Sequence, residues 1–232
     1  MTVTAPLERP VWNCLTGRQA HLAVAIGAAV RIDSNFGPFA AARDRSSEAQ
    51  TALAALLTGP DDALWLVEAE EWPVPPGTRV LRTATLLQMV AEHPQPPLPD
   101  DGEFLALGEA DAPEMTELAL ATEPGPWRPL THRYGQFYGL RDADGHLMAM
   151  AGERMQPGPG LAEVSGVCTW PEFRGQGLAG RLIRRVMAAQ VARGEVPFLH
   201  SYAANSKAIG LYESLGFRAR REMIATVLVK HD

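Results

Sequence analysis

The chain has 232 residues, of which 46% are hydrophobic, and a formal net charge of -6 at pH 7. This length and composition allow one large domain or two small ones, each with a buried core. The acidic balance argues against a nucleic-acid-binding protein, because such proteins neutralise phosphates with a basic surface. The two cysteines, Cys14 and Cys168, are too few for a disulfide framework or a zinc cluster, which favours a cytoplasmic location.

The first strongly apolar segment is 22–30 (LAVAIGAAV). It is too short to cross a bilayer, and no basic region leads into it, as a secretory signal would require. We therefore predict a buried strand or hairpin arm here. Neither a membrane partner nor an export segment is expected.

Four prolines in the segment 94–99 (PQPPLP) form a stiff, extended stretch that neither a helix nor a central strand tolerates. We expect it to separate an N-terminal α/β accessory region, residues 1–100, from a C-terminal domain, residues 101–232. The first region could be a diverged structural duplicate of the second. Its pattern predicts strands at 22–32, 64–68 and 78–82, a helix at 47–57 and an apolar segment at 86–90.

The C-terminal region follows a clearer order. Strands are predicted at 104–107, 136–141, 146–154, 162–169, 196–202 and 217–229, the last as one or two strands. Helices are predicted at 112–121, with Asp111 as N-cap, from 178 to the glycine at 194, and at 206–215, with Asn205 as N-cap. This order predicts an α/β fold: a mixed sheet with helices on both faces and a parallel strand–helix–strand crossover.

A glycine-rich turn follows the strand at 162–169 and opens an amphipathic helix. Its glycines are Gly175, Gly177 and Gly180. Such a turn lets a ligand approach the backbone, and free N–H groups at a helix start bind phosphate. A tight strand–helix connection is the alternative for an isolated motif. Gly180 favours a packing or ligand reason, because a glycine in a helix costs about 1 kcal/mol relative to alanine.

Two further features lie near this turn. Gly166 interrupts a strand, as a β-bulge would, although an ordinary packing glycine fits that residue alone better. Asn205 and Tyr212 are seven residues apart and therefore share one helix face, roughly 10 Å apart along the axis. Tyr212 could protonate a departing thiolate, or it could be a core aromatic beside a helix cap.

These pieces resemble the GNAT N-acetyltransferase superfamily over the span from about Glu103 to the C-terminus. The resemblance rests on 167–179 (VCTWPEFRGQGLA) and 205–217 (NSKAIGLYESLGF) at the expected separation. Two shorter pieces, 149–155 (AMAGERM) and 197–200 (PFLH), are similar to the glycine-N-acyltransferase-like branch. The implied fold is the GNAT fold with a central bulged strand.

The resemblance also implies an activity and its residues: an acyl-CoA-dependent, most simply acetyl-CoA-dependent, N-acyltransferase that acts on an amine acceptor without a metal. Tyr212 would be the general acid, and either Glu163 or His200 the base, with a base acting through water also open. The residues implied to bind the donor are Val167, Cys168, Thr169, Arg174, Gly175, Gln176, Gly177, Leu178, Ala179, Gly180 and Asn205. A homodimer is compatible with this assignment.

Two rival functions can be weighed. A non-catalytic acyl-CoA-binding or sensor module on the same scaffold is disfavoured, because Asn205 and Tyr212 are both present. A nucleotide-binding P-loop is set aside, because the turn lacks the Gly-Lys-Ser/Thr ending. Cys168 has no sign of the lowered thiol pKa that a covalent acyl-enzyme would need, and the other histidines, His146 among them, lack metal-ligand spacing.

Overall fold

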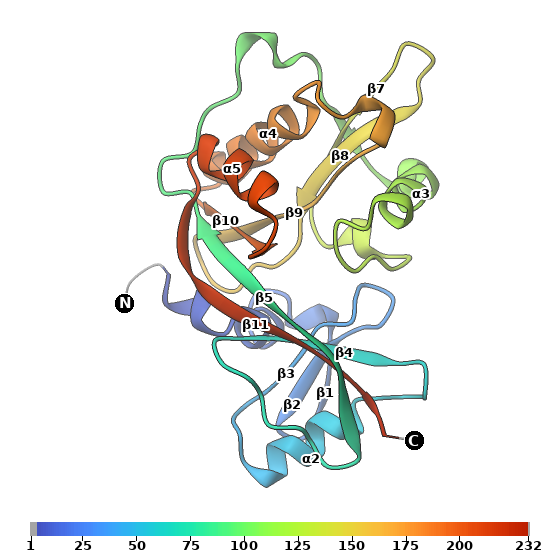
Figure 1. Ribbon diagram of the computed structural model, residues 1–232, viewed down its shortest axis with the longest axis vertical. Helices are drawn as coiled ribbons and strands as arrows, with labels where there is room; N and C mark the ends of the chain where they lie inside the picture. The colour runs from blue at the N-terminus through green and yellow to red at the C-terminus, as the bar shows by residue number, and fades with distance from the viewer. Residues whose placement is uncertain (1–3, 232) are drawn as a thin grey trace.

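The computed structural model describes residues 4–231, whose strands form two sheets (Figure 1). The larger sheet has eight strands in the order β4-β11-β5-β10-β9-β8-β7-β6, and the smaller has the order β1-β2-β3. The strands are β1 (Ala23–Ile26), β2 (Ala29–Ile32), β3 (Ala40–Ala42), β4 (Ala63–Glu68), β5 (Thr78–Val90), β6 (Leu105–Leu107), β7 (Phe137–Arg141), β8 (Leu147–Glu153), β9 (Leu161–Thr169), β10 (Val196–Tyr202) and β11 (Arg218–Lys230). The helices are α1 (Pro10–Leu15), α2 (Ser47–Ala55), α3 (Ala112–Thr122), α4 (Leu178–Ala192) and α5 (Ser206–Ser214). The predicted mixed α/β fold is confirmed.

Three of the predicted elements differ in detail. Residues 22–32 form a hairpin rather than one strand, because Gly27 turns the chain at a φ of 52°. Its first arm is largely exposed, with Val24 at 46%, so the expectation of a buried segment holds only for β2. The strand predicted at 78–82 and the apolar segment at 86–90 are one continuous strand, β5, which pairs along its length with the equally long β11.

The centre of the sheet contains a short parallel pair. β10 runs parallel to β9 only over Val196–Phe198 and Leu161–Glu163, which confirms the predicted parallel crossover through α4. Beyond these three pairs β9 continues along β8 and β10 continues along β5. The β9 edge that faces β10 is therefore unpaired from Val164 onward within the described residues, next to the glycine turn.

Helices cover both faces of the sheet. Ala149 and Ala151 of β8 pack in a cluster with α4 residues such as Leu182, whereas the intervening Met150 packs in a cluster with α3 residues such as Met115. Successive residues of a strand point to opposite faces, so α4 and α3 lie on opposite sides of β8 (Figure 1).

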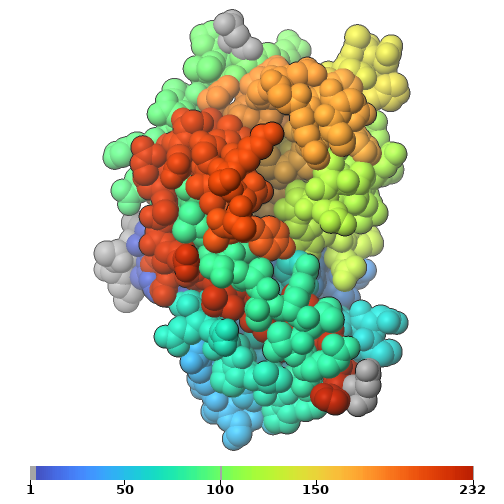
Figure 2. Space-filling model, viewed as in Figure 1, coloured from blue at the N-terminus to red at the C-terminus, as the bar shows by residue number. Residues whose placement is uncertain are grey.

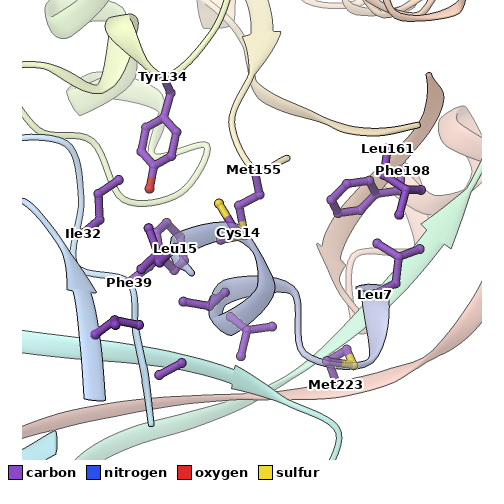
Figure 3. Packing of buried hydrophobic residues seen from close by; sticks show 14 of the residues in the cluster. Leu7, Cys14, Leu15, Ile32, Phe39, Tyr134, Met155, Leu161, Phe198 and Met223 are labelled. Carbon is purple, nitrogen blue, oxygen red and sulfur yellow. The ribbon is translucent and has the colours of Figure 1, made fainter. Parts of the chain in front are cut away.

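The N-terminal segment packs directly on the parallel pair. Leu7 and Cys14 share a buried cluster with Leu161 of β9 and Phe198 of β10, as Figure 3 shows. Leu7, Leu161 and Phe198 each have no exposed surface, and fully burying one such side chain contributes about 1.5–3 kcal/mol. The same cluster includes Phe39, which lines the cleft described below.

The proline-rich segment 94–99 is fixed at both ends. The Gln95 N–H donates to the Leu215 carbonyl at 3.0 Å, and the buried carboxylate of Asp101 pairs with Arg184 of α4. β4 and β5 precede the segment, yet they hydrogen-bond within the eight-stranded sheet. The domain division at residue 100 stays a prediction. Among the described residues, no helix has the length and apolar character needed to cross a membrane.

Candidate active site

A cleft of about 590 Å³ lies where β9 and β10 diverge. It is lined by the glycine turn, the end of β9, α5, the connection from α3 to β7, and residues of β4, β5 and β11. Figure 2 shows this face, hollowed between α5 on one side and α3 on the other. Every residue predicted for the site lines the cleft except Gln176 and Glu163.

The glycine turn presents a run of unpaired backbone N–H groups. α4 begins at Leu178 with Gly177 as N-cap, and no side chain caps it. Within the described chain, no hydrogen bond joins the N–H groups of residues 175–180 to another residue. Gly175 and Gly177 have φ values of 81° and 75°, which L side chains rarely adopt. The turn and the helix dipole therefore offer an anion-binding site.

Gly180 has no packing reason to be glycine. A Cβ built on it would lie 3.6 Å from Leu211 Cδ1 and 3.7 Å from Arg184 Nη1, which are ordinary contact distances. Gly180 also lines the cleft, and its role in binding a ligand stays a prediction.

The β-bulge predicted at Gly166 is confirmed. Opposite Met150 and Gly152 of β8, strand β9 places Cys168 and Ser165, so β9 contains one extra residue. Gly166 has a φ of 61°, and a Cβ on it would lie 2.7 Å from the Phe137 ring. Both facts require glycine. The bulge redirects the strand where the unpaired edge faces the cleft.

Asn205 and Tyr212 lie on α5, as predicted. Asn205 caps the helix through a 3.2 Å hydrogen bond that its Oδ1 accepts from the Ala208 N–H. By contrast, Asp111 stands at the N-cap position of α3 without capping it, because its carboxylate accepts bonds from Gly108 and Arg141. Tyr212 borders the cleft, and its hydroxyl makes no hydrogen bond to a described residue. Burial raises the pKa of Tyr212 above 10, so the hydroxyl holds its proton at neutral pH.

Glu163 is buried behind the cleft, with 1% of its side chain exposed. One carboxylate oxygen accepts from Nδ1 of His200 at 2.9 Å, and the other accepts from Nε of Arg154 and the Met155 N–H, each at 3.2 Å. Burial alone would raise its pKa, but Arg154 and His200 outweigh burial and lower the pKa to about 2. A carboxylate that holds its charge so firmly is a weak proton acceptor.

His200 reaches the cleft, yet both of its ring nitrogens have partners. Nδ1 bonds to Glu163, and Nε2 lies 3.0 Å from the amide nitrogen of Gln88 on the neighbouring strand β5. Its side chain is only 5% exposed. Sequence analysis did not single out Gln88, because a lone glutamine in a strand carries no catalytic spacing.

Cys168 lines the cleft as a neutral thiol. Its side chain is buried, and burial raises the pKa of the thiol to about 12. This direction agrees with the expectation that Cys168 is no covalent nucleophile, because such a nucleophile requires a lowered thiol pKa.

Several cleft residues were not foreseen from the sequence. Phe39, Trp65 and Leu86 come from the N-terminal region, and Arg154 follows β8. Glu123 ends α3 in the left-handed conformation, at φ 49° and ψ 55°. These positions are distant in the chain and belong to no motif, so only the three-dimensional fold brings them together.

Three residues outside the cleft gather potential metal ligands. Ligand atoms of Asp142, Asp144 and His146 lie within 4.8 Å of one another in the turn between β7 and β8. Asp142 accepts hydrogen bonds from the Asp144 and His146 N–H groups. The hairpin turn itself therefore explains their proximity, and we assign no metal to it.

Comparison with known proteins agrees with this fold. Residues 137–225 match the family model described as FR47-like protein. The chain is 32% identical over 123 residues to the N-alpha-acetyltransferase RimI of Mycobacterium tuberculosis, covering 49% of this chain and 76% of the relative. It is 63% identical to a solved structure from Novosphingobium aromaticivorans that is assigned to the GNAT acetyltransferase family, with a TM-score of 0.92, covering 98% of this chain and 99% of the other.

A more distant structure shares the fold alone. The GCN5-related N-acetyltransferase from Kribbella flavida is 19% identical, has a TM-score of 0.61 and covers 100% of this chain and 97% of its own. Together with the bulged strand and the glycine turn, the identity to RimI and to the Novosphingobium protein places the sequence in a family. The chain belongs to the GNAT superfamily of N-acetyltransferases.

Proposed function

We propose that this protein transfers an acyl group, most simply acetyl, from acyl-CoA to an amine by direct attack. The observation that carries the proposal is the row of unpaired N–H groups at 175–180, which shares one cleft with the Tyr212 side chain. The N–H groups and the α4 dipole suit the pyrophosphate of coenzyme A. The unpaired β9 edge suits the amides of the pantetheine arm, and Arg174 and Lys207 add positive charge along the cleft.

In the proposed reaction the amine nitrogen attacks the thioester carbonyl carbon, and the carbon–sulfur bond then breaks. Backbone N–H groups near the bulge stabilise the negative charge that develops on the carbonyl oxygen. Tyr212 gives its proton to the departing thiolate. Its raised pKa keeps the proton in place before reaction, and it also makes the donation uphill, since a cysteine-type thiol has a reference pKa of about 8.5.

The proton lost by the amine leaves most readily through water in the cleft. Glu163 does not line the cleft and its oxygens are already paired. His200 lines it, but its Nε2 is paired with Gln88. We therefore assign His200 and Glu163 to positioning and charge balance beside the acceptor. The base that acts through water, one of the three options from the sequence, is the one that these contacts favour.

The relatives support acyl transfer to an amine more strongly than they identify which amine is the acceptor. The name of the mycobacterial relative specifies an α-amine as its acceptor, and we propose the same class of acceptor for this chain. The similarity to the glycine-N-acyltransferase-like branch rests on two short segments and points to the same kind of amine.

Coenzyme A release with acetyl-CoA and a panel of amines tests the proposal, with wild type and Tyr212→Phe compared. We expect acceptor-dependent release by wild type and a fall in kcat of about 10²- to 10⁴-fold in the variant. Tight acetyl-CoA binding with no release for any amine would instead favour the non-catalytic sensor. Equal rates for both proteins would remove Tyr212 as the acid.

A further inference from the structure

We propose that the acceptor is a free α-amino acid with an apolar or aromatic side chain, and that Arg154 binds its carboxylate. This inference rests on the proposed function and specifies its substrate class. Arg154 follows β8 directly and lines the cleft. The observations that support it are the unused donors of its guanidinium and the apolar residues that line the same cleft.

The guanidinium of Arg154 is held in place from behind. Its Nε donates to Glu163 Oε2 at 3.2 Å, and its central carbon lies 4.8 Å from the centroid of the Phe39 ring. These two contacts fix the plane of the group, and 14% of the side chain remains exposed.

The outer edge of the same guanidinium has no partner. Neither Nη1 nor Nη2 makes a hydrogen bond to a described residue. Glu163 cannot satisfy them fully, because that carboxylate also accepts from His200 and from the Met155 N–H. A fixed guanidinium with free Nη donors matches the planar geometry of a carboxylate, and such charge-assisted pairs are stronger than neutral hydrogen bonds.

Arg154 also lies in the right place for an α-carboxylate. Arg154 and Gly166 line one small hollow beside Gly125 and Pro126. Gly166 forms the bulge, next to which the amine and the thioester must meet. In an α-amino acid one carbon separates the amine from the carboxylate, so a carboxylate on Arg154 leaves the amine beside the bulge.

Apolar residues from the N-terminal region line another part of the cleft. Phe39, Trp65, Val67 and Leu86 line it, and the rings of Phe39 and Trp65 pack edge to face with centroids 6.4 Å apart. Such a surface favours an apolar or aromatic side chain on the acceptor. A peptide N-terminus would place a neutral amide where the free amino acid has its carboxylate, and Arg154 would lose its charged partner.

The first test compares L-phenylalanine with L-phenylalanine amide and a phenylalanyl dipeptide as acceptors for the wild-type protein. The three share an amine and a side chain, and only the first has an α-carboxylate. We expect kcat/KM for the amino acid to exceed the other two by about 10- to 100-fold, since a hydrogen bond to a charged group contributes that much. Equal or better use of the amide or the dipeptide would overturn the inference and leave the proposed function standing.

Variants then test whether Arg154 causes the preference for the acceptor that carries an α-carboxylate. Arg154→Lys keeps a positive charge beside Glu163 but lacks the two-pronged geometry, so the ratio of kcat/KM for the amino acid to kcat/KM for the amide should fall to within a few-fold of unity. Arg82→Lys is the matched control, because Arg82 also stacks on a cleft aromatic, Trp65, but does not line the cleft. A preference that survives in Arg154→Lys would exclude this residue as the carboxylate ligand.

A binding measurement separates failure of the inference from failure of the proposed function. Calorimetry with coenzyme A present compares N-acetyl-L-phenylalanine with its amide, and neither compound requires turnover. Tighter binding of the carboxylate, lost in Arg154→Lys, is expected even if no acceptor released coenzyme A. Equal affinities of wild type for the two compounds would overturn the inference.

Discussion

Gln88 and His200 face each other across the antiparallel pair of β5 and β10, with the Gln88 amide nitrogen 3.0 Å from His200 Nε2. The orientation of the amide is set by its other partners. Gln88 Nε2 donates to the Leu7 carbonyl at 3.1 Å, and its Oε1 accepts from Arg220 at 2.8 Å. The amide must therefore donate to Nε2 of His200, which leaves the ring proton on Nδ1, where it bonds to Glu163.

This relationship predicts one tautomer of His200. In protein labelled with ¹⁵N-histidine, the ring resonances of His200 at neutral pH should show a protonated Nδ1 and an unprotonated, hydrogen-bonded Nε2. Gln88→Met removes the donor to Nε2 and should shift that resonance, whereas Glu163 still holds Nδ1. A proton on Nε2 in the wild-type protein would contradict the assignment, because the Gln88 amide nitrogen could then no longer donate to that atom.

Glu163 should stabilise the fold in a pH-dependent way. Its pKa is lowered from 4.5 to about 2, so the ionised form stabilises the folded state. The contribution is complete above about pH 4.5 and is lost as pH falls towards 2. Glu163→Gln leaves Arg154 without its buried partner and should lower the free energy of unfolding at pH 7 by about 3–5 kcal/mol.

Denaturant unfolding at pH 7 and pH 3 measures this effect. The difference between wild type and Glu163→Gln should shrink at the lower pH. Glu222→Gln, at an exposed position on β11, is the control and should change stability little at either pH. An equal difference between wild type and Glu163→Gln at both pH values would contradict a stabilising role of the charge.

A substitution at Gly180 should affect the stability of the fold and the binding of coenzyme A in opposite directions. Gly180→Ala fits the surrounding protein and should stabilise the helix by up to about 1 kcal/mol. Because Gly180 lines the cleft at the start of α4, the added methyl group should weaken coenzyme A binding. Gly210→Ala in α5 is the control, since nothing lies within 4 Å of its built Cβ and it does not line the cleft.

Thermal unfolding measures the change in stability, and calorimetry measures the change in affinity for coenzyme A. We expect both variants to unfold at the same or a higher temperature, and only Gly180→Ala to bind coenzyme A less tightly. Unchanged affinity in Gly180→Ala would mean that the pyrophosphate lies away from this turn.

The donor half of the site could be predicted from the sequence because its requirements are local. The φ values of Gly175 and Gly177 and the cap at Asn205 each depend on neighbours within a few residues. The acceptor half could not be predicted in this way. Arg154 meets Phe39 across more than a hundred residues of chain, and no spacing rule encodes such a contact.

The same reason explains why the sequence alone leaves the choice between Glu163 and His200 open. They lie on adjacent strands, where the Nδ1 of His200 donates to Glu163. The residue that restricts His200, Gln88, lies on a strand that precedes the proline-rich segment. A sequence shows that a histidine and a glutamate are present. It does not show which atoms are already paired.

Glu123 is the one carboxylate among the described residues that line the cleft. It is exposed, and its backbone lies at φ 49° and ψ 55°, the only positive φ of a non-glycine residue in the described chain. A strained residue at the mouth of a binding site suggests a function for its side chain. The negative charge should attract an amine that arrives as a cation.

Two substitutions at Glu123 distinguish charge from strain. Glu123→Gln should raise KM for the amine a few-fold at low ionic strength, leave KM for acetyl-CoA unchanged, and lose its effect as salt screens the charge. Glu123→Gly should raise KM similarly while stabilising the fold by about 1 kcal/mol, because glycine adopts the left-handed conformation without strain. Glu117→Gln, exposed on the same helix and outside the cleft, is the control for net charge. If Glu117→Gln raised KM as much as Glu123→Gln, the effect would belong to the overall charge of the protein and not to this site.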